Sequence, residues 1–199
     1  PRSAVGNLWW KKAFAGSDFA RPSIGTEAGL AAIAHADLAA FVPSRLSRSK
    51  LVVGAAGALD KATLGRLLDQ AFGVLPTAAP PAIAVPDRPQ SFELALARLP
   101  APQTAISFGQ PGLPTDDPAW EAQLVVNRIL AGGGFASRLM EEVREKRGLS
   151  YGIGAQIVPF GARSTLVLGA SSTENARVPE TLSVLRAVWA EFAKEGPTA

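Results

Sequence analysis

The most informative segment of this chain reads Gly132-Gly133-Gly134-Phe135-Ala136-Ser137-Arg138-Leu139-Met140-Glu141-Glu142-Val143-Arg144-Glu145-Lys146-Arg147-Gly148-Leu149-Ser150-Tyr151. It predicts a glycine turn, a charged helix over 136–147 that Gly148 ends, and a strand that begins at Tyr151, because glycine tolerates the backbone conformations of turns and helix ends. A phosphate-binding loop would need a preceding strand and a Lys-Ser or Lys-Thr ending, which this segment lacks. We therefore expect the glycines to form a turn between two helices, with Ser137 near the start of the second.

The C-terminal half predicts two strands, two helices, two further strands and a final helix. These elements are expected at 92–99, at 103–109, after Asp116 or Asp117, at 136–147, at 151–158, at 164–170, and from Thr173 to Gly196. The inward side chains of the first two strands are expected to be Leu94, Leu96, Ile106 and Phe108. This order predicts an α+β fold, an antiparallel-rich sheet with helices packed on one face. The strand–helix alternation of a nucleotide-binding sheet is missing.

The N-terminal part predicts a helix over 3–15, short helices that begin at Thr26 and Asp37, a buried strand over 51–56 and a helix that Asp60 caps. Pro43 should limit the helix that begins at Asp37. One strand cannot form a sheet, so we expect this part to be the end of a domain whose beginning is missing.

Five prolines between 76 and 90 predict an extended linker, because proline fixes φ and removes a backbone donor. The expected division is the end of a first α+β domain over 1–75, the linker over 76–90, and a related second α+β domain over 91–199. This second domain is expected to be truncated at its C-terminus.

Composition excludes several functions. The chain has 199 residues with no cysteine and one histidine, His35, so it cannot supply the two imidazoles of a two-His, one-Glu zinc site. The net charge of +3 is spread along the chain and gives no basic patch for nucleic acid. Its apolar runs are shorter than the roughly 20 residues of a transmembrane helix. Pro1 begins the sequence without a methionine or a signal pattern, so we expect a piece of a longer protein in which any signal segment lies upstream. With no transmembrane helix expected, the protein is expected to be soluble, and both the cytoplasm and the periplasm stay open as its compartment.

Arg144 and Tyr151 are the candidate binding residues, because they flank the predicted helix end at Gly148 and can emerge at one edge. A guanidinium and a phenol hydroxyl placed there could bind the carbonyls of an extended peptide. Alternatively, Arg144 pairs with Glu141 and Tyr151 is half-buried, and the residues alone favour this second interpretation. Adjacent Glu141 and Glu142 should point to different sides of a helix, which makes them poor acid/base partners.

The segment Val143–Tyr151 (V-R-E-K-R-G-L-S-Y) and the segment Phe19–Glu27 (F-A-R-P-S-I-G-T-E) resemble the non-catalytic half of insulinase/pitrilysin-type zinc peptidases, including the processing-peptidase branch. In that family a catalytic half carries an H-x-x-E-H zinc motif. The other half of the clamshell has lost the motif and supplies an Arg and a Tyr, seven residues apart, to the bound peptide. The resemblance therefore implies that Arg144 and Tyr151 bind substrate and that no residue of this chain is catalytic.

The resemblance also implies partners. Zinc is expected upstream of Pro1 or on a companion subunit, so the chain would enclose and align a peptide or protein substrate for hydrolysis elsewhere in the molecule, in a heterodimer or in a homo-oligomer. One alternative is a structural, non-cleaving subunit like the core proteins of respiratory complexes. Another is a peptide-binding module that acts alone.

Overall fold

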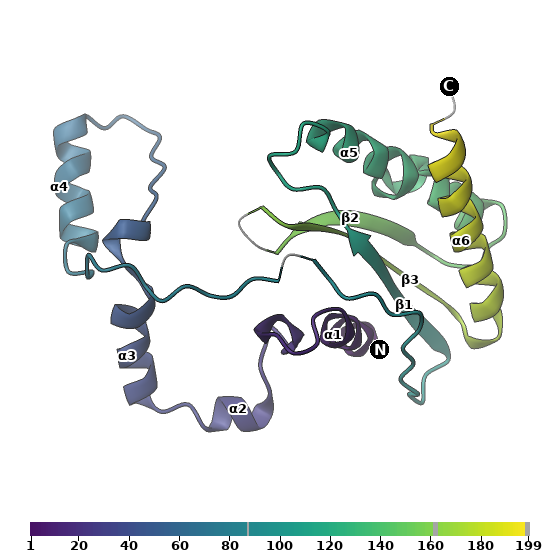
Figure 1. Cartoon of the computed structure of the whole chain (residues 1–199), viewed down its shortest axis with the longest axis horizontal. Coiled ribbons are helices and arrows are strands. Elements are labelled where there is room, and N and C mark those ends of the chain that lie inside the picture. The colour runs from purple at the N-terminus through teal and green to yellow at the C-terminus, as the bar shows by residue number, and fades with distance from the viewer. Residues whose placement is uncertain (87, 161–162, 198–199) are drawn as a thin grey trace. The chain divides into compact units, whose positions relative to one another are not determined.

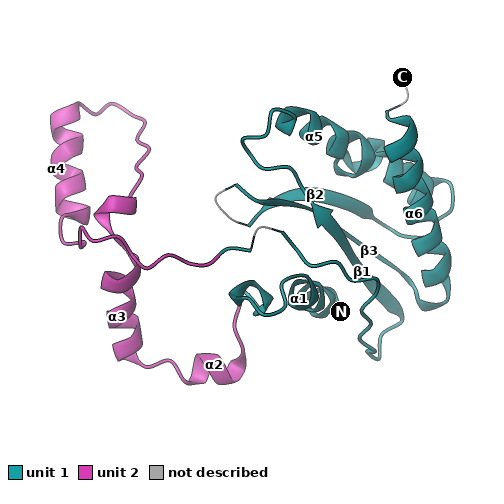
Figure 2. Ribbon diagram, in the orientation of Figure 1, with its two compact units in different colours: residues 1–23, 85–199 teal, residues 24–84 magenta. Residues whose placement is uncertain are grey.

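A computed structural model describes residues 1–86, 88–160 and 163–197. The chain divides into two compact units, which Figure 2 shows in different colours. Unit 1 consists of Pro1–Ser23 and Val85–Ala199, and unit 2 consists of Ile24–Ala84. The N-terminal 23 residues thus group with the C-terminal half. The domain boundaries expected from the proline-rich stretch stay a prediction.

Unit 1 is an α+β sheet structure, as predicted (Figure 1). Its elements are α1 (Arg2–Ala13), η1 (Asp18–Ala20), β1 (Gln103–Pro111), α5 (Trp120–Asn127), η3 (Arg128–Gly132), η4 (Gly134–Ala136), η5 (Met140–Glu145), β2 (Ile153–Pro159), β3 (Thr165–Glu174), η6 (Asn175–Arg177) and α6 (Val178–Glu195). Segments η3 and η5 are π-helical, whereas η1, η4 and η6 are 3₁₀ turns. Among the described residues the sheet has the order β1-β3-β2, and both pairings are antiparallel.

The central strand β3 separates two apolar clusters, because successive side chains of a strand point to opposite faces. Val167 lies in the larger cluster, to which α6 contributes Leu185, Val188 and Phe192. This is the expected arrangement of helices on one face of the sheet. Leu166 belongs to the other cluster, where α1 contributes Trp9 and Ala13. The helix α1 therefore covers the opposite face, an addition that the sequence pattern did not predict.

Gly169 shows how closely the larger cluster is packed. It pairs with Phe108 across β1 and β3. A Cβ atom at Gly169 would collide with the ring of Phe108. That ring in turn meets Trp189 of α6 edge to face, with centroids 5.8 Å apart. Glycine is therefore required here by the approach of an aromatic side chain and not by its backbone conformation.

Unit 2 contains α2 (Glu27–Ala31), α3 (His35–Arg45), η2 (Arg48–Lys50) and α4 (Lys61–Phe72). Two of these helices, α2 and α4, begin at side-chain caps, as the sequence predicts. The Asp60 carboxylate accepts a hydrogen bond from the Thr63 N–H at 2.8 Å, and Thr26 Oγ1 accepts one from the Gly29 N–H at 3.1 Å. Helix α3 starts two residues before Asp37, whose carboxylate accepts from the Ala34 N–H at 2.8 Å. Pro43 lies within the last turn of that helix.

Two predicted strands are wrong. Residues 51–56 and 92–99 are not strands, and Val52 and Leu94 are 93% and 70% exposed. A strand is stable only when a neighbour takes up its backbone N–H and C=O groups. Among the described parts of the chain no strand pairs with either segment, and their apolar character alone does not make them strands.

The final helix also begins later than predicted. Thr173 is part of β3, because the pairing with β1 continues to Glu174 opposite Gln103. The chain then turns through η6, and α6 starts at Val178. The predicted helix over 136–147 is likewise shorter and less regular, since 134–136 form the 3₁₀ turn η4 and Met140–Glu145 form the π-helical segment η5.

Candidate functional site

The guanidinium of Arg144 lies over two aromatic rings. Its Cζ atom is 4.4 Å from the centroid of the Phe135 ring and 4.6 Å from that of the Tyr151 ring. Both rings are open to solvent, with Phe135 63% and Tyr151 84% exposed. We call these three residues the aromatic clamp. They come from three separate segments, the turn η4, the helix η5 and the loop that precedes β2.

The clamp differs from the alternative in which Arg144 pairs with Glu141 and Tyr151 is half-buried. Glu141 binds Lys146 instead, with an oxygen 2.9 Å from its Nζ atom. Among the described residues Arg144 makes no ion pair with a carboxylate. A guanidinium directs its N–H donors outward in its own plane. Ring faces take up none of these donors as a carboxylate would, which leaves them for an acceptor outside the protein.

The backbone reversal at Gly148 brings Tyr151 back over Arg144. Gly148 has φ of +57°, a left-handed conformation that favours glycine. Its N–H donates to the Arg144 carbonyl at 2.9 Å, and the Leu149 N–H donates to the Val143 carbonyl at 2.9 Å. Val143 is fully buried, so the reversal is attached to the core. The predicted helix end at Gly148 is confirmed.

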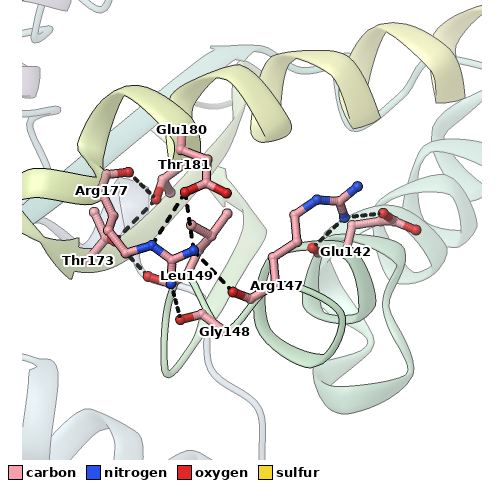
Figure 3. A network of polar contacts seen from close by, with 8 residues as sticks. All are labelled: Glu142, Arg147, Gly148, Leu149, Thr173, Arg177, Glu180 and Thr181. Carbon is pink, nitrogen blue, oxygen red and sulfur yellow. Dashed lines mark hydrogen bonds and ion pairs between the residues drawn. The ribbon is translucent and has the colours of Figure 1, made fainter.

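Arg177 ties the loop between Arg144 and Tyr151 to the start of α6 (Figure 3). Its Nη1 atom donates to the Gly148 carbonyl at 3.1 Å, and its Nη2 atom donates to the Arg147 carbonyl at 3.3 Å. Glu180 holds the same guanidinium at 3.1 Å. One arginine thus satisfies two carbonyls at a helix end, where backbone acceptors have no partner within the helix.

Buried hydroxyls fix the next residues of that loop. Thr173 Oγ1 donates to the Leu149 carbonyl at 2.6 Å, and Thr181 Oγ1 lies 3.1 Å from Thr173 Oγ1 (Figure 3). Farther along, Ser171 Oγ lies 2.9 Å from Ser150 Oγ, and both serines are buried. The exposed Tyr151 ring therefore stands on a backbone that β3 and α6 hold on its buried side.

Phe135 was not among the predicted site residues. Gly134, with φ of +61°, reverses the chain just before it, as the predicted turn requires. A Cβ atom at Gly133 would lie 2.7 Å from the Arg128 carbonyl oxygen, so this glycine is needed for a close backbone approach. Ser137 is fully buried, and its hydroxyl donates to the Gly134 carbonyl at 2.9 Å. A large aromatic residue directly after a glycine turn was the one signal available for Phe135.

Two carboxylates of η5, those of Glu141 and Glu142, form ion pairs with basic side chains. The Oε1 atom of Glu142 lies 2.6 Å from Lys146 Nζ, and its Oε2 atom lies 2.5 Å from Arg147 Nη1. The hydrogen bond from Lys146, followed by that from Arg147, lowers the pKa of the Glu142 carboxyl group. Hydrogen bonds to Glu142 and then Glu141 raise the pKa of Lys146. Both adjacent glutamates reach the same amine, so the prediction that they point to different sides is wrong. The π-helical path of η5 differs from the regular α-helix on which that prediction depended.

The residues that the structure describes do not form a site for a zinc ion. Across residues 1–86, 88–160 and 163–197, no three His, Cys, Asp or Glu side chains lie close enough to hold a metal. The single histidine, His35, is the first residue of α3 in unit 2.

No helix within residues 1–86, 88–160 and 163–197 is long and apolar enough to cross a membrane.

The family described as peptidase M16 inactive domain matches residues 32–199. The chain therefore belongs to this family, and the resemblance to the non-catalytic half of zinc peptidases is confirmed. A protein of Mycobacterium leprae named as an uncharacterized zinc protease is 28% identical over 204 residues, which cover all of this chain and 45% of that protein. A similarly named protein of Streptomyces coelicolor is 34% identical over 161 residues, 77% of this chain and 35% of its own length.

Solved structures share the fold. The peptidase M16 inactive domain of Pseudomonas fluorescens superposes with a TM-score of 0.86 at 31% identity, over all of this chain and 48% of that one. A chain of complex III2 from Candida albicans has a TM-score of 0.79 at 16% identity, over all of this chain and 48% of its own, which shows the fold alone. The chain thus spans about half the length of the relatives it matches.

Proposed function

We propose that this chain encloses and aligns a peptide substrate for hydrolysis at a zinc site that an upstream domain or a partner chain supplies. The observation that carries the proposal is the aromatic clamp. It combines an arginine unpaired with carboxylates among the described residues and an exposed tyrosine on a rigidly held loop. The relatives named as zinc proteases support the reaction class, and membership of a family described as an inactive domain supports a non-catalytic part in that reaction.

The chemistry of the clamp suits an extended backbone. Arg144 offers N–H donors to one or two carbonyl oxygens, and the Tyr151 hydroxyl offers a further donor. This role needs neither proton transfer nor a covalent bond. Their contribution is orientation, since a peptide placed wrongly by about 1 Å can react roughly a hundredfold more slowly.

Replacement of Arg144 by alanine in the full-length protein tests this role. We expect kcat/KM for a fluorogenic peptide to fall about 10- to 100-fold, as for the loss of a charge-assisted hydrogen bond, with the zinc content unchanged. Arg147→Ala is the matched control, because its guanidinium binds Glu142 and not the rings. It should leave turnover within about twofold. Normal turnover in Arg144→Ala would refute the assignment.

A structural, non-cleaving subunit is the second candidate, and the fold shared with a chain of complex III2 favours it. This role predicts a stable assembly that cleaves no peptide under any metal condition. It also predicts that Arg144→Ala and Tyr151→Ala leave assembly unchanged. A peptidase assay of the full-length protein with and without a chelator separates the two candidates.

A further inference from the structure

We propose that Phe135 is a positioning residue, which holds the Arg144 guanidinium in the orientation that receives the peptide. This inference rests on the proposed function and extends it to a third side chain. Phe135 is close to Arg144 in space but nine residues away in sequence, on a different segment. It would act through Arg144 and need not touch the substrate itself.

Phe135 is distinguished from other exposed apolar residues by its contact with Arg144. A single exposed apolar side chain is common on protein surfaces and has no meaning alone. The Arg144 Cζ atom, however, lies over the Phe135 ring, 4.4 Å from its centroid and within the range of a cation–π interaction. Tyr151 lies on the same guanidinium at 4.6 Å. With one ring alone the guanidinium could move away, whereas contact with two rings restricts its position.

The turn that carries Phe135 is well supported. Gly134 supplies the left-handed conformation before it, and the buried Ser137 hydroxyl closes the turn onto the Gly134 carbonyl. The Arg144 side chain would otherwise lose much rotamer freedom on binding a peptide, and that loss opposes binding. Because both rings already hold the guanidinium before the substrate binds, part of this entropic cost is removed.

Substitutions of Phe135 in the full-length protein test the inference through kcat and KM for a fluorogenic peptide. Phe135→Ala should lower kcat/KM about two- to fivefold, the range expected for loss of an exposed cation–π contact. Phe135→Tyr and Phe135→Trp should restore it, because they keep an aromatic face. Phe135→Leu should behave like alanine, although it keeps apolar bulk. Val125→Ala, which truncates a 59% exposed apolar residue of α5, is the matched control and should change nothing.

A double-mutant cycle shows whether Phe135 acts through Arg144. In the Arg144→Ala background, Phe135→Ala should cause no further loss. Full additivity, or a Leu variant as active as wild type, would overturn the positioning role while leaving the proposed function intact. Normal activity of Arg144→Ala would instead overturn the proposed function, and this inference with it. Far-UV circular dichroism and thermal melting of each variant establish that the fold is retained.

Discussion

Unit 1 and unit 2 use the same local rules but differ in what they bury. In unit 1, β3 is paired on both sides and separates two clusters of buried apolar side chains. In unit 2, all of whose residues are described, Ser47 alone is buried, while α2, α3 and α4 keep their caps and turns. Local signals are therefore sufficient to form helices in both units. A closed core needs partners from distant parts of the chain, and only unit 1 contains them.

Truncation of one leucine in each unit should give the largest contrast. Leu139→Ala removes a side chain that is fully buried in the larger cluster and should lower the free energy of unfolding by about 2–5 kcal/mol. Leu67→Ala affects a helical leucine that is 47% exposed and should change it by no more than about 0.5 kcal/mol. Urea denaturation of both variants measures the difference. Equal losses would mean that unit 2 buries Leu67 in the full-length protein, and the contrast would fail.

Glycine-to-alanine substitutions should give effects of opposite sign. Gly169→Ala places a methyl group against the Phe108 ring and should destabilise unit 1 by about 1–3 kcal/mol. Gly65 lies inside α4, where an added Cβ atom would meet no neighbouring side chain within 4 Å, so Gly65→Ala should stabilise that helix by about 0.5–1 kcal/mol. Thermal unfolding shows whether each substitution raises or lowers the melting temperature. Destabilisation by Gly65→Ala would show that α4 is packed against something at that position.

Low pH should lower the stability of both units, by less than the substitutions described above. Hydrogen bonds from Lys146 and Arg147 lower the pKa of Glu142 in unit 1, and the backbone hydrogen bond from Thr63 lowers the pKa of Asp60 in unit 2. A depressed folded-state pKa adds stability that is complete above the unfolded pKa and is lost as the pH falls through the folded value. Glu142→Gln and Asp60→Asn should therefore flatten the fall in melting temperature below about pH 4.5. Unchanged acid profiles in both variants would contradict these contacts.

Sequence reasoning predicted the elements that depend on nearby residues. The cap at Asp60, the helix end at Gly148 and the turn at Gly134 each follow from one residue type in one backbone conformation. It was wrong for residues 51–56 and 92–99, whose apolar pattern indicates strands. Whether an apolar segment becomes a strand depends on a neighbour that its own sequence does not specify. The cover that α1 provides over the second face of the sheet was missed for the same reason.

The candidate site likewise contains residues that the sequence could predict and residues that it could not. Arg144 and Tyr151 could be singled out because they flank one helix end, and their role in binding remains a prediction. Phe135 was missed, since its contact with Arg144 depends on how η4 and η5 pack and not on a fixed spacing. The support from Arg177 was missed because its two carbonyl acceptors lie 29 and 30 residues away.

The contact of Arg144 with two rings has a consequence for how ionic strength affects peptide binding. A guanidinium held by carboxylates is partly neutralised, and added salt weakens its attachment at the surface. Arg144 is held by ring faces, so screening should leave its position nearly unchanged while its positive charge stays available to the ligand. Binding of neutral peptides should then be nearly independent of salt. Peptides with an acidic side chain near the clamp should bind more tightly at low salt and lose that advantage as the Debye length shortens.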